Sequence, residues 1–457
     1  MQRLTFFFAL LLLPAAGQAG PLSRAEAVAR ALEANPDVRK SLEDLARLDG
    51  LITEAKADAL PEINVYGTFN RYRDPSLLNS SSFDSFPPDL IAALKPVPAN
   101  LYEGTAQIKQ TLFSFKLGHA IKAARLGRAF GQEELQRARQ AVALAAVVAY
   151  NDYLLGLERA KVAERSVAQK EKQLEISRNR RAAGVATDLD VLRFQVDLEN
   201  ERAQLLRVQG QADLLRGRLN AVLVRPIDDP ITPTDSLAFL PYEVTIDEAV
   251  REAWANRPEA RAIAFYERIR DELIGVAKAE SRPSLDLNAA YGWSVRKPAN
   301  FLESDFSKWN IGVSLKVPLF DGFRTAGKVA QARAEKSKVT QDRIALENQI
   351  RLEAKEAVDR LRVARKVLEA AGLNAGQARQ ALDMTEANYR LGAASPIDVL
   401  VAQAALNQAE SNRNEALYTH AIARAGLRYV MARDVLDPSP TGSQSPAPTS
   451  GPETRQD

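Results

Sequence analysis

Three carboxylates stand directly after two glycine-containing turns, where they could act on ions. Asp188 and Asp190 follow the turn 184–187, and Asp398 follows the turn 392–395. A ring of such carboxylates at a narrow point of a pore selects cations, and like charges can raise one another's pKa. Alternatively, Asp188 and Asp398 cap the helices that begin there, because a carboxylate suits the positive end of a helix. The cap is the favoured interpretation for Asp188, while both stay open for Asp398.

The composition gives no support to catalytic or metal chemistry. The 457 residues include no cysteine, and the two histidines, His119 and His420, lie far apart without the spacing of a ligand set. The glycines of 322–327 lack the pattern of a phosphate loop. Lysine and arginine number 61 against 58 acidic residues, so no global field recruits nucleic acid. We expect a protein that is not an enzyme, holds no cofactor or metal and binds no nucleic acid.

Two very long helices must position these carboxylates. Alanine-rich apolar residues recur at alternating spacings of four and three, which indicates the seam of a supercoiled helix. The seam comprises Ile350, Ala354, Ala357, Leu361, Ala364, Leu368, Ala371, Ala375, Ala378 and Leu382. Proline is absent from 319 to 395, so a helix over 325–391 would be about 100 Å long at 1.5 Å per residue. A second proline-free stretch predicts a long helix over 116–183, and shorter helices are expected over 188–224 and 395–433.

The two ends of the chain differ from the rest. Residues 1–19 carry one positive charge, a short apolar run and the small residues Gly17 and Ala19, which is typical of a secretory signal cut after Ala19. No later stretch is continuously apolar over the ~18 residues that a membrane helix needs. A mature chain that crosses a membrane must therefore do so with strands. The proline- and serine-rich segment 437–457 predicts a disordered tail.

Four segments alternate apolar and polar residues, as strands with two different faces do. They are 61–73, 101–114, 283–297 and 308–320. Their length and the aromatic residues near their ends match a tilted outer-membrane strand with an aromatic girdle. The predicted girdle residues are Tyr102, Tyr291, Trp293 and Trp309. A soluble sandwich would show the same alternation, but the signal peptide and the long helices favour the membrane.

The chain is duplicated internally. Asn35-Pro36 recurs as Arg257-Pro258, and 184–192 recurs as 392–400, at offsets of about 210 to 220 residues. Each copy reads helix, strand, strand, long helix, turn, helix. The expected boundaries are 20–224 for the first repeat, 225–244 for a linker and 245–436 for the second repeat.

Four strands cannot close a barrel, and open sheet edges are not tolerated in lipid, so the chain must oligomerise. A dimer would supply eight strands and a trimer twelve, and twelve leave room for a lumen. The predicted fold class is an α+β membrane protein: a homotrimeric 12-stranded outer-membrane β-barrel, four strands per chain, continuous with a long periplasmic α-helical barrel. The far tips of that helical barrel are the turns at Gly184 and Gly392.

The strand exit 317–322 and the tip motif 389–403 resemble the TolC family of outer-membrane efflux proteins, and the resemblance covers nearly all of 22–433. It implies a homotrimeric channel for passive export, in tripartite efflux or type I secretion. It also implies two partners, a periplasmic adaptor and an inner-membrane transporter of the RND, ABC or MFS type, in addition to outer-membrane lipid. The exported substrate cannot be read from the chain, because selection lies largely in the pump.

The resemblance also carries site residues. Tyr389 and Asp398 match gate positions of the family. The family gate uses an arginine and a second aspartate where this chain has Ala394 and Val401, so Arg181 or Arg193 of the first repeat could substitute. Small residues at both turns are predicted to let an adaptor hairpin approach the backbone. These tip residues are Gly184, Val185, Ala186, Gly392, Ala393, Ala394 and Ser395.

Two other classes of protein share some of these features. A periplasmic adaptor also contains a helical hairpin, but it usually carries one hairpin inside nested small β-domains, whereas this chain has two. A structural coiled-coil protein of the cell envelope would not need the paired amphipathic strands.

Overall fold

The computed structural model describes residues 20–73, 87 and 97–436, so the predicted signal peptide and tail lie outside the described residues. The chain divides into two compact units. Of the described residues, the helical unit contains 20–42, 134–260 and 346–436, and the sheet unit contains the described residues of 43–133 together with 261–345. Four helices contribute residues to both units: α2 (Pro36–Ala57), α4 (Phe115–Ala182), α7 (Pro258–Ala279) and α8 (Arg324–Arg390).

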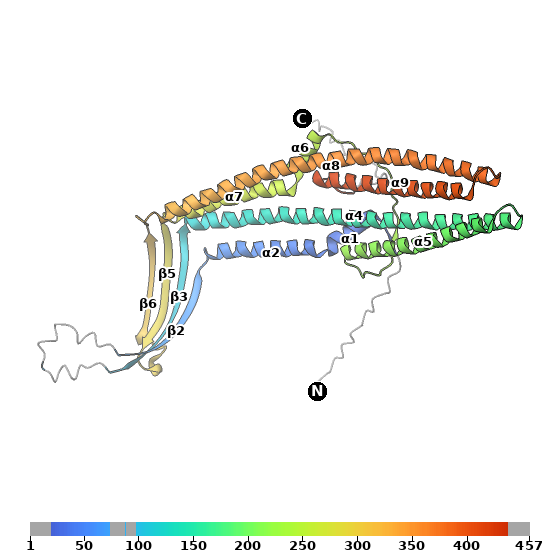
Figure 1. Cartoon of the computed structure of the whole chain (residues 1–457). Helices are drawn as coiled ribbons and strands as arrows, with labels where there is room; N and C mark the ends of the chain where they lie inside the picture. Colours follow the sequence, from blue (N-terminus) through green and yellow to red (C-terminus); the bar gives the residue numbers. More distant parts are fainter. Residues whose placement is uncertain (1–19, 74–86, 88–96, 437–457) are drawn as a thin grey trace, which may run out of the picture. The chain divides into compact units, whose positions relative to one another are not determined.

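The sheet unit is built on a four-stranded antiparallel sheet in the order β2-β3-β5-β6 (Figure 1). Its strands are β2 (Glu62–Tyr72), β3 (Ala99–Ser114), β5 (Ser284–Val295) and β6 (Ser307–Lys316). The short helices η3 (Pro298–Asn300) and η4 (Ser304–Phe306) connect β5 to β6. β6 ends at Lys316, short of the predicted residue 320, because Pro318 has no N–H to donate to a ladder.

One face of this sheet is apolar across all four strands. The register places Val65 opposite Ala106, Ala106 opposite Tyr291, and Tyr291 opposite Trp309. Since alternate residues share a face, the apolar face includes Ile63, Val65, Phe69, Tyr102, Ile108, Leu287, Tyr291, Trp293, Trp309, Ile311, Val313 and Leu315. The opposite face is polar and carries hydrogen-bonded pairs, for example Thr111 with Asp286 at 2.9 Å. The predicted alternation is therefore a property of the whole sheet.

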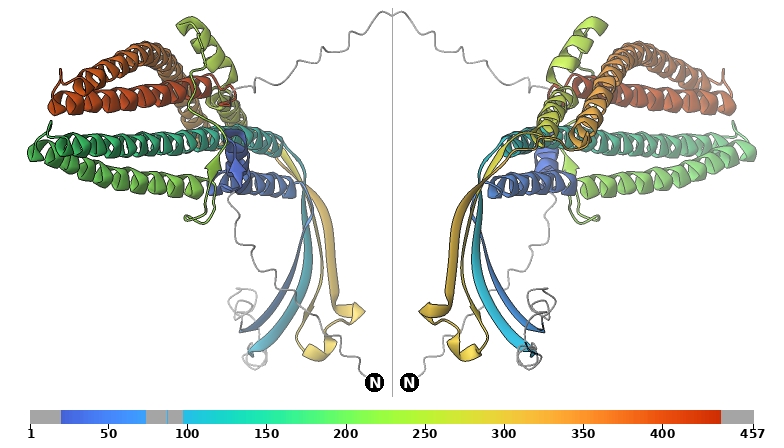
Figure 2. Two further views of the ribbon diagram at one scale, coloured as in Figure 1. Left: turned by 90° about the vertical axis from the view of Figure 1, so that its right-hand side faces the viewer. Right: turned by 90° about the vertical axis from the view of Figure 1, so that its left-hand side faces the viewer.

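The helical unit contains two hairpins. In Figure 2, α5 (Asp188–Val222) lies along α4, and α9 (Pro396–Val430) lies along α8. Two shorter helices, α1 (Arg24–Ala34) and α6 (Ile246–Asn256), belong to the same unit. The two-residue strands β1 (Pro21–Leu22) and β4 (Thr232–Pro233) pair in parallel.

The second helices of the two hairpins, α5 and α9, are followed by residues with the same backbone conformation. Val224 follows α5 and Ala432 follows α9, and both have a positive φ, 55° and 53°. Proline begins α2, α7 and α9, where its missing N–H costs nothing because the first turn of a helix leaves that group unpaired. The positive φ after α5 and α9 and the proline that begins α2 and α7 recur in both repeats, which supports the internal duplication.

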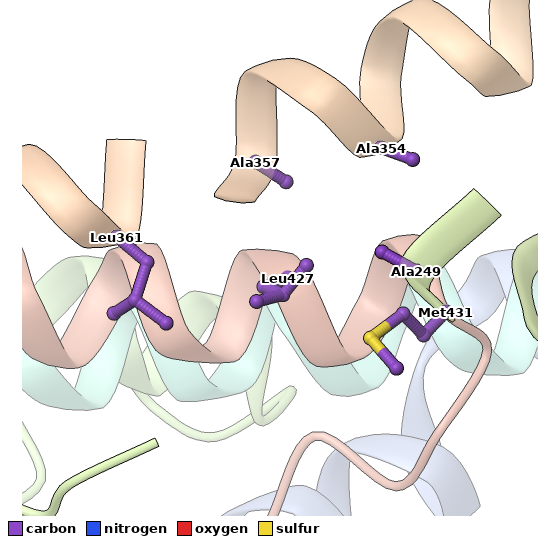
Figure 3. Close-up of a cluster of buried hydrophobic side chains, with 6 residues drawn as sticks. All are labelled: Ala249, Ala354, Ala357, Leu361, Leu427 and Met431. Carbon is purple, nitrogen blue, oxygen red and sulfur yellow. The ribbon is translucent and has the colours of Figure 1, made fainter. Parts of the chain in front are cut away.

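The predicted seam of α8 is a buried stripe. Ile350, Leu361 and Leu382 are each at most 4% exposed, while Ala371, Ala375 and Ala378 are partly buried. Figure 3 shows a cluster in which the seam residues pack with α6 and α9; its members are Ala249, Ala354, Ala357, Leu361, Leu427 and Met431. Alanine knobs let the helices approach closely.

One helix of the described part, α4, includes a segment long and apolar enough to cross a membrane. Of that segment, 56% is buried inside the structure, as expected for a helix that packs against other helices.

Candidate gate and docking region

Equivalent turns end the two hairpins. Gly184 and Gly392 have φ values of 78° and 80°, a left-handed conformation that glycine adopts without strain. Most of the predicted tip residues are exposed: Gly184, Val185, Gly392, Ala393 and Ser395, while Ala186 and Ala394 are partly buried. Leu391, which the sequence analysis did not single out, is 83% exposed beside the second turn.

Asp398 caps the start of α9 through a reciprocal pair of bonds with Ser395. Its carboxylate accepts hydrogen bonds from the Ser395 N–H at 2.8 Å and hydroxyl at 2.7 Å. The Ser395 hydroxyl accepts a hydrogen bond from the Asp398 N–H at 3.3 Å. These bonds stabilise the ionised carboxyl and hold the pKa of Asp398 below its ordinary value. A single chain therefore shows Asp398 in the capping role.

The equivalent cap of α5 uses Asp190, so the expectation that Asp188 is the cap was wrong. The Asp190 carboxylate accepts hydrogen bonds from the Thr187 N–H at 2.9 Å and hydroxyl at 2.8 Å, and these lower the pKa of Asp190. A side chain at the third helical position can reach back to the cap, whereas one at the first position cannot. Asp188 instead forms an ion pair with Arg181 and is exposed.

Tyr389 lies in a small apolar cluster at the tip rather than on the surface. We call this cluster the tip core; it comprises Leu174, Phe194, Leu198, Tyr389 and Val399. The Phe194 and Tyr389 ring centroids are 6.3 Å apart, and Tyr389 is 7% exposed. Burial raises the pKa of the Tyr389 hydroxyl. Ala394, which stands at the family's arginine position, packs against the same cluster.

Arg180 joins the first hairpin to Tyr389 in two ways. Its Nη1 donates to the Tyr389 carbonyl at 2.8 Å, and its guanidinium carbon lies 4.6 Å from the centroid of the Tyr389 ring. A guanidinium over an aromatic face is attracted by the ring quadrupole. The arginine that contacts the predicted gate tyrosine is therefore Arg180, while Arg181 pairs with Asp188 and Arg193 lies near Asp190.

Arg180 is the last member of a polar seam along α4. This polar seam comprises Ser166, Lys170, Gln173, Ser177 and Arg180. The first four are at most 8% exposed. Their spacing alternates between four and three, so the heptad signal was present in the sequence. Residue type conceals this signal, because polar residues ordinarily mark the solvated face of a helix.

The polar seam and a neighbour hydrogen-bond to the second hairpin. Asn407 of α9 donates to the Ser166 hydroxyl at 2.8 Å. Gln169 and Gln173 both donate to the carboxylate of Glu386 on α8, at 3.0 Å and 3.3 Å. Near the tip, the two hairpins are thus held together mainly by polar contacts around a small apolar cluster.

Lys170 instead binds within its own hairpin. Its Nζ lies 2.6 Å from Glu201 and 3.0 Å from Asp197, both on α5. The first hairpin therefore has an internal ion-pair network, which ties its two helices together independently of the second hairpin.

The predicted girdle residues lie on the apolar face. Trp309 and Tyr291 are neighbours in the register and are 71% and 48% exposed. The Tyr291 ring also contacts Trp293, with centroids 5.1 Å apart. Trp293 in turn lies beneath Phe301 of the β5–β6 connection, with ring centroids 6.0 Å apart. Tyr102 stacks on Phe69 at 4.9 Å.

No group of histidine, cysteine, aspartate or glutamate side chains among the described residues is arranged to hold a metal ion. The carboxylates at the tip are engaged in caps and ion pairs, and so they offer charge rather than a coordination shell.

Comparison with known proteins gives consistent results. The family described as "Outer membrane efflux protein" matches residues 27–223 and 249–433, one match per repeat. Outer membrane protein OprJ of Pseudomonas aeruginosa is 27% identical over 384 residues, which cover 82% of this chain and 76% of OprJ. Outer membrane protein TolC of Salmonella enteritidis is 23% identical, covering 91% of this chain and 85% of TolC. A crystal structure of a membrane protein from Pseudomonas aeruginosa superposes with a TM-score of 0.75 at 23% identity, covering 89% of this chain and 92% of that one.

Proposed function

The chain belongs to the outer membrane efflux protein family and is a non-enzymatic outer-membrane efflux channel that extends into the periplasm, and we propose that three copies form it around one water-filled bore. The observation that carries the proposal is the continuous apolar face of the sheet. Such a face suits contact with lipid, and the polar face behind it suits a water-filled lumen.

The free edges of the sheet argue for assembly. Within the described chain, β2 and β6 each pair on one side only. Unpaired N–H and C=O groups are costly in lipid, so each edge needs a partner strand from another copy. Three copies supply twelve strands, which leave a lumen, whereas eight would be filled by side chains. Trp309 and Tyr291 would then meet the membrane–water interface as part of an aromatic girdle.

The gate opens when the second hairpin parts from the first along the polar seam. Hydrogen bonds such as those of Glu386 with Gln169 and Gln173 exchange for bonds to water at a net cost of about 1 kcal/mol each. An apolar seam would resist separation more strongly. Tyr389 keeps this gate closed, because Arg180 and the tip core bind it to the first hairpin.

Asp188, Asp190 and Asp398 supply negative charge next to both turns, and three copies of them would favour cations at the constriction. Because Ser395 and Thr187 keep Asp398 and Asp190 ionised, these carboxylates hold their charge across neutral and mildly acidic pH.

The exposed turns dock a periplasmic adaptor, which couples the channel to an inner-membrane transporter of the RND, ABC or MFS type. Gly392, Ala393 and Gly184 leave the backbone accessible to a partner hairpin, and Leu391 offers apolar area beside them. Export through the channel is passive, and the transporter supplies both energy and substrate choice.

Fractionation and export tests check the proposal together. We expect the mature chain in the outer-membrane fraction as an SDS-resistant trimer, and we expect its deletion to raise the sensitivity of cells to exported compounds. A soluble monomer in the periplasm would instead support an adaptor or an envelope coiled-coil protein.

A further inference from the structure

His420 of α9 is a fully buried imidazole. It is 1% exposed, and neither ring nitrogen has a hydrogen-bond partner among the residues that the structure describes. A neutral imidazole is normally both a donor and an acceptor, so leaving both nitrogens unpaired is costly. The gate and docking region do not use this residue.

A surface segment covers the imidazole. We call residues 237–243 the strap; they connect β4 to α6 and have no regular secondary structure. The Phe239 ring lies on His420 with centroids 4.9 Å apart, and Phe239 is itself 45% exposed. One aromatic ring therefore separates the imidazole from water on this side, so the strap can lift without unfolding of the helices.

Two arginines lie near the imidazole. Arg424, on the next turn of α9, donates to the Leu240 carbonyl of the strap at 3.2 Å. Arg365 of α8 is paired with Glu243 of the strap and lies 3.7 Å from Glu369. From α4, Asp152 is bonded to Tyr418 at 2.6 Å. These three carboxylates are thus each already engaged by another group.

One side of the strap faces an open groove. Tyr242 and Glu243 of the strap, with Arg362 and Arg365 of α8, line part of this groove, which has a volume of about 400 Å³ and lies next to the site. A surface segment without regular secondary structure beside such a groove is of the kind that opens locally.

We propose that His420 is an acid-sensitive latch: when its imidazole takes up a proton, the strap detaches from α8 and α9. A buried imidazolium would be a third positive charge beside Arg424 and Arg365, with two N–H donors and no acceptor. Release of Phe239 lets water solvate it.

The pH range follows from linkage. Burial, with Arg424 and Arg365 nearby, lowers the pKa of His420 in the latched state from its ordinary 6.5. The released state therefore binds the proton more readily, and the latch is fully stable above about pH 6.5 and weakens as pH falls below it. If the latched imidazole stays neutral at about pH 5.5, one unit below the ordinary pKa, the released population should be about tenfold larger there.

Amide hydrogen exchange on the purified channel in detergent tests the latch, with rates corrected for the pH dependence of intrinsic exchange. Protection of 237–243 should fall about tenfold between about pH 7.5 and 5.5, while that of α1 stays constant. His420→Leu should abolish the fall, and His420→Gln is a second neutral variant in case the leucine disturbs folding.

The chain offers a matched control, because His119 is its other histidine. His119→Gln removes an imidazole that is paired with Glu272 at 2.6 Å, and it should leave the acid response of the strap intact. Constant protection of 237–243 in the unmodified channel would overturn the proposal. The proposal would also be overturned if acid lowered the protection of 237–243 in both His420 variants as much as in the unmodified channel.

Discussion

Arg180 joins the two hairpins beside the turns, so its removal should loosen the gate. Arg180→Ala loses the bond to the Tyr389 carbonyl and the contact with its ring, together worth about 2 kcal/mol. That corresponds to about a 30-fold larger open population, seen in planar bilayers as more frequent or larger conductance steps. Arg178→Ala, an exposed neighbour, should behave like the unmodified channel. Identical traces for both variants would exclude Arg180 from the gate.

Ser395 and Asp398 allow charge to be separated from capping. Ser395→Ala removes the two hydrogen bonds of the hydroxyl but keeps the carboxylate and its bond to the backbone N–H of that residue, so cation selectivity should persist at neutral pH. The pKa of Asp398 should then rise toward its ordinary 3.8, and selectivity should disappear at a higher pH than in the unmodified channel. Asp398→Ala should lose part of the selectivity at every pH. Reversal potentials in a salt gradient, titrated downward from neutral pH, measure both effects. If Asp398→Ala leaves the reversal potential unchanged, Asp398 does not line the constriction.

At the scale of elements, the second turn should act as a docking surface. Ala393 is exposed and has an ordinary backbone conformation, so a larger side chain fits without strain in the isolated chain. Ala393→Trp should therefore abolish export while the trimer still assembles. Cells that carry this variant should become at least tenfold more susceptible to the exported compound. Ala393→Ser, which keeps the residue small, should export normally. Normal export by the tryptophan variant, or loss of assembly in it, would count against docking at this turn.

The elements also show what the sequence could predict. The seam of α8 was recognised because its residues are apolar, whereas the seam of α4 near the tip has the same spacing but carries Gln173 and Arg180. Heptad spacing reports which residues face a partner helix, while residue type alone suggested solvent. Asp188 and Asp190 are two residues apart in the first turn of α5. Side-chain geometry determines which of them can bond to the cap residue, and the sequence alone does not show this geometry.

Alternation along the strands predicts the two faces of the sheet, but it does not predict which side chains from outside the strands cover them. Trp293 and Trp309 look equivalent in the sequence, yet Phe301 from the β5–β6 connection lies on Trp293 alone. Contacts made by an irregular connection do not recur at a regular spacing, so no pattern in the sequence predicts them.

Across the helical unit, the kinds of contact differ in a way that suits a gated conduit. The cluster of α6, α8 and α9 in Figure 3 is apolar and closely packed, whereas the hairpins near the tip are joined by polar contacts together with the small apolar tip core. Burial of apolar groups is lost entirely on separation, but polar groups regain bonds to water. The tip can therefore open while the apolar cluster of the same unit keeps its structure.

The number of copies in the channel can be tested through the sheet edges, because the chain has no cysteine of its own. One cysteine on β2, at Asn64, and one on β6, at Asn310, Gly312 or Ser314, would place a thiol on each edge of the polar face. If β2 of one copy pairs with β6 of the next, one of these three registers should form disulfides that close a ring.

Samples are boiled first, so that an SDS-resistant trimer without crosslinks dissociates. Denaturing gels without reductant should then show a product of three chains that reverts to monomers on reduction. Variants with a single cysteine should stay monomeric, because like edges do not meet in a closed ring with head-to-tail strand pairing. A ladder that stops at two chains would indicate an eight-stranded barrel without a lumen, and would contradict the proposed channel. Monomers in all three registers would mean that the edges of β2 and β6 do not pair, and the apolar face would then need another explanation.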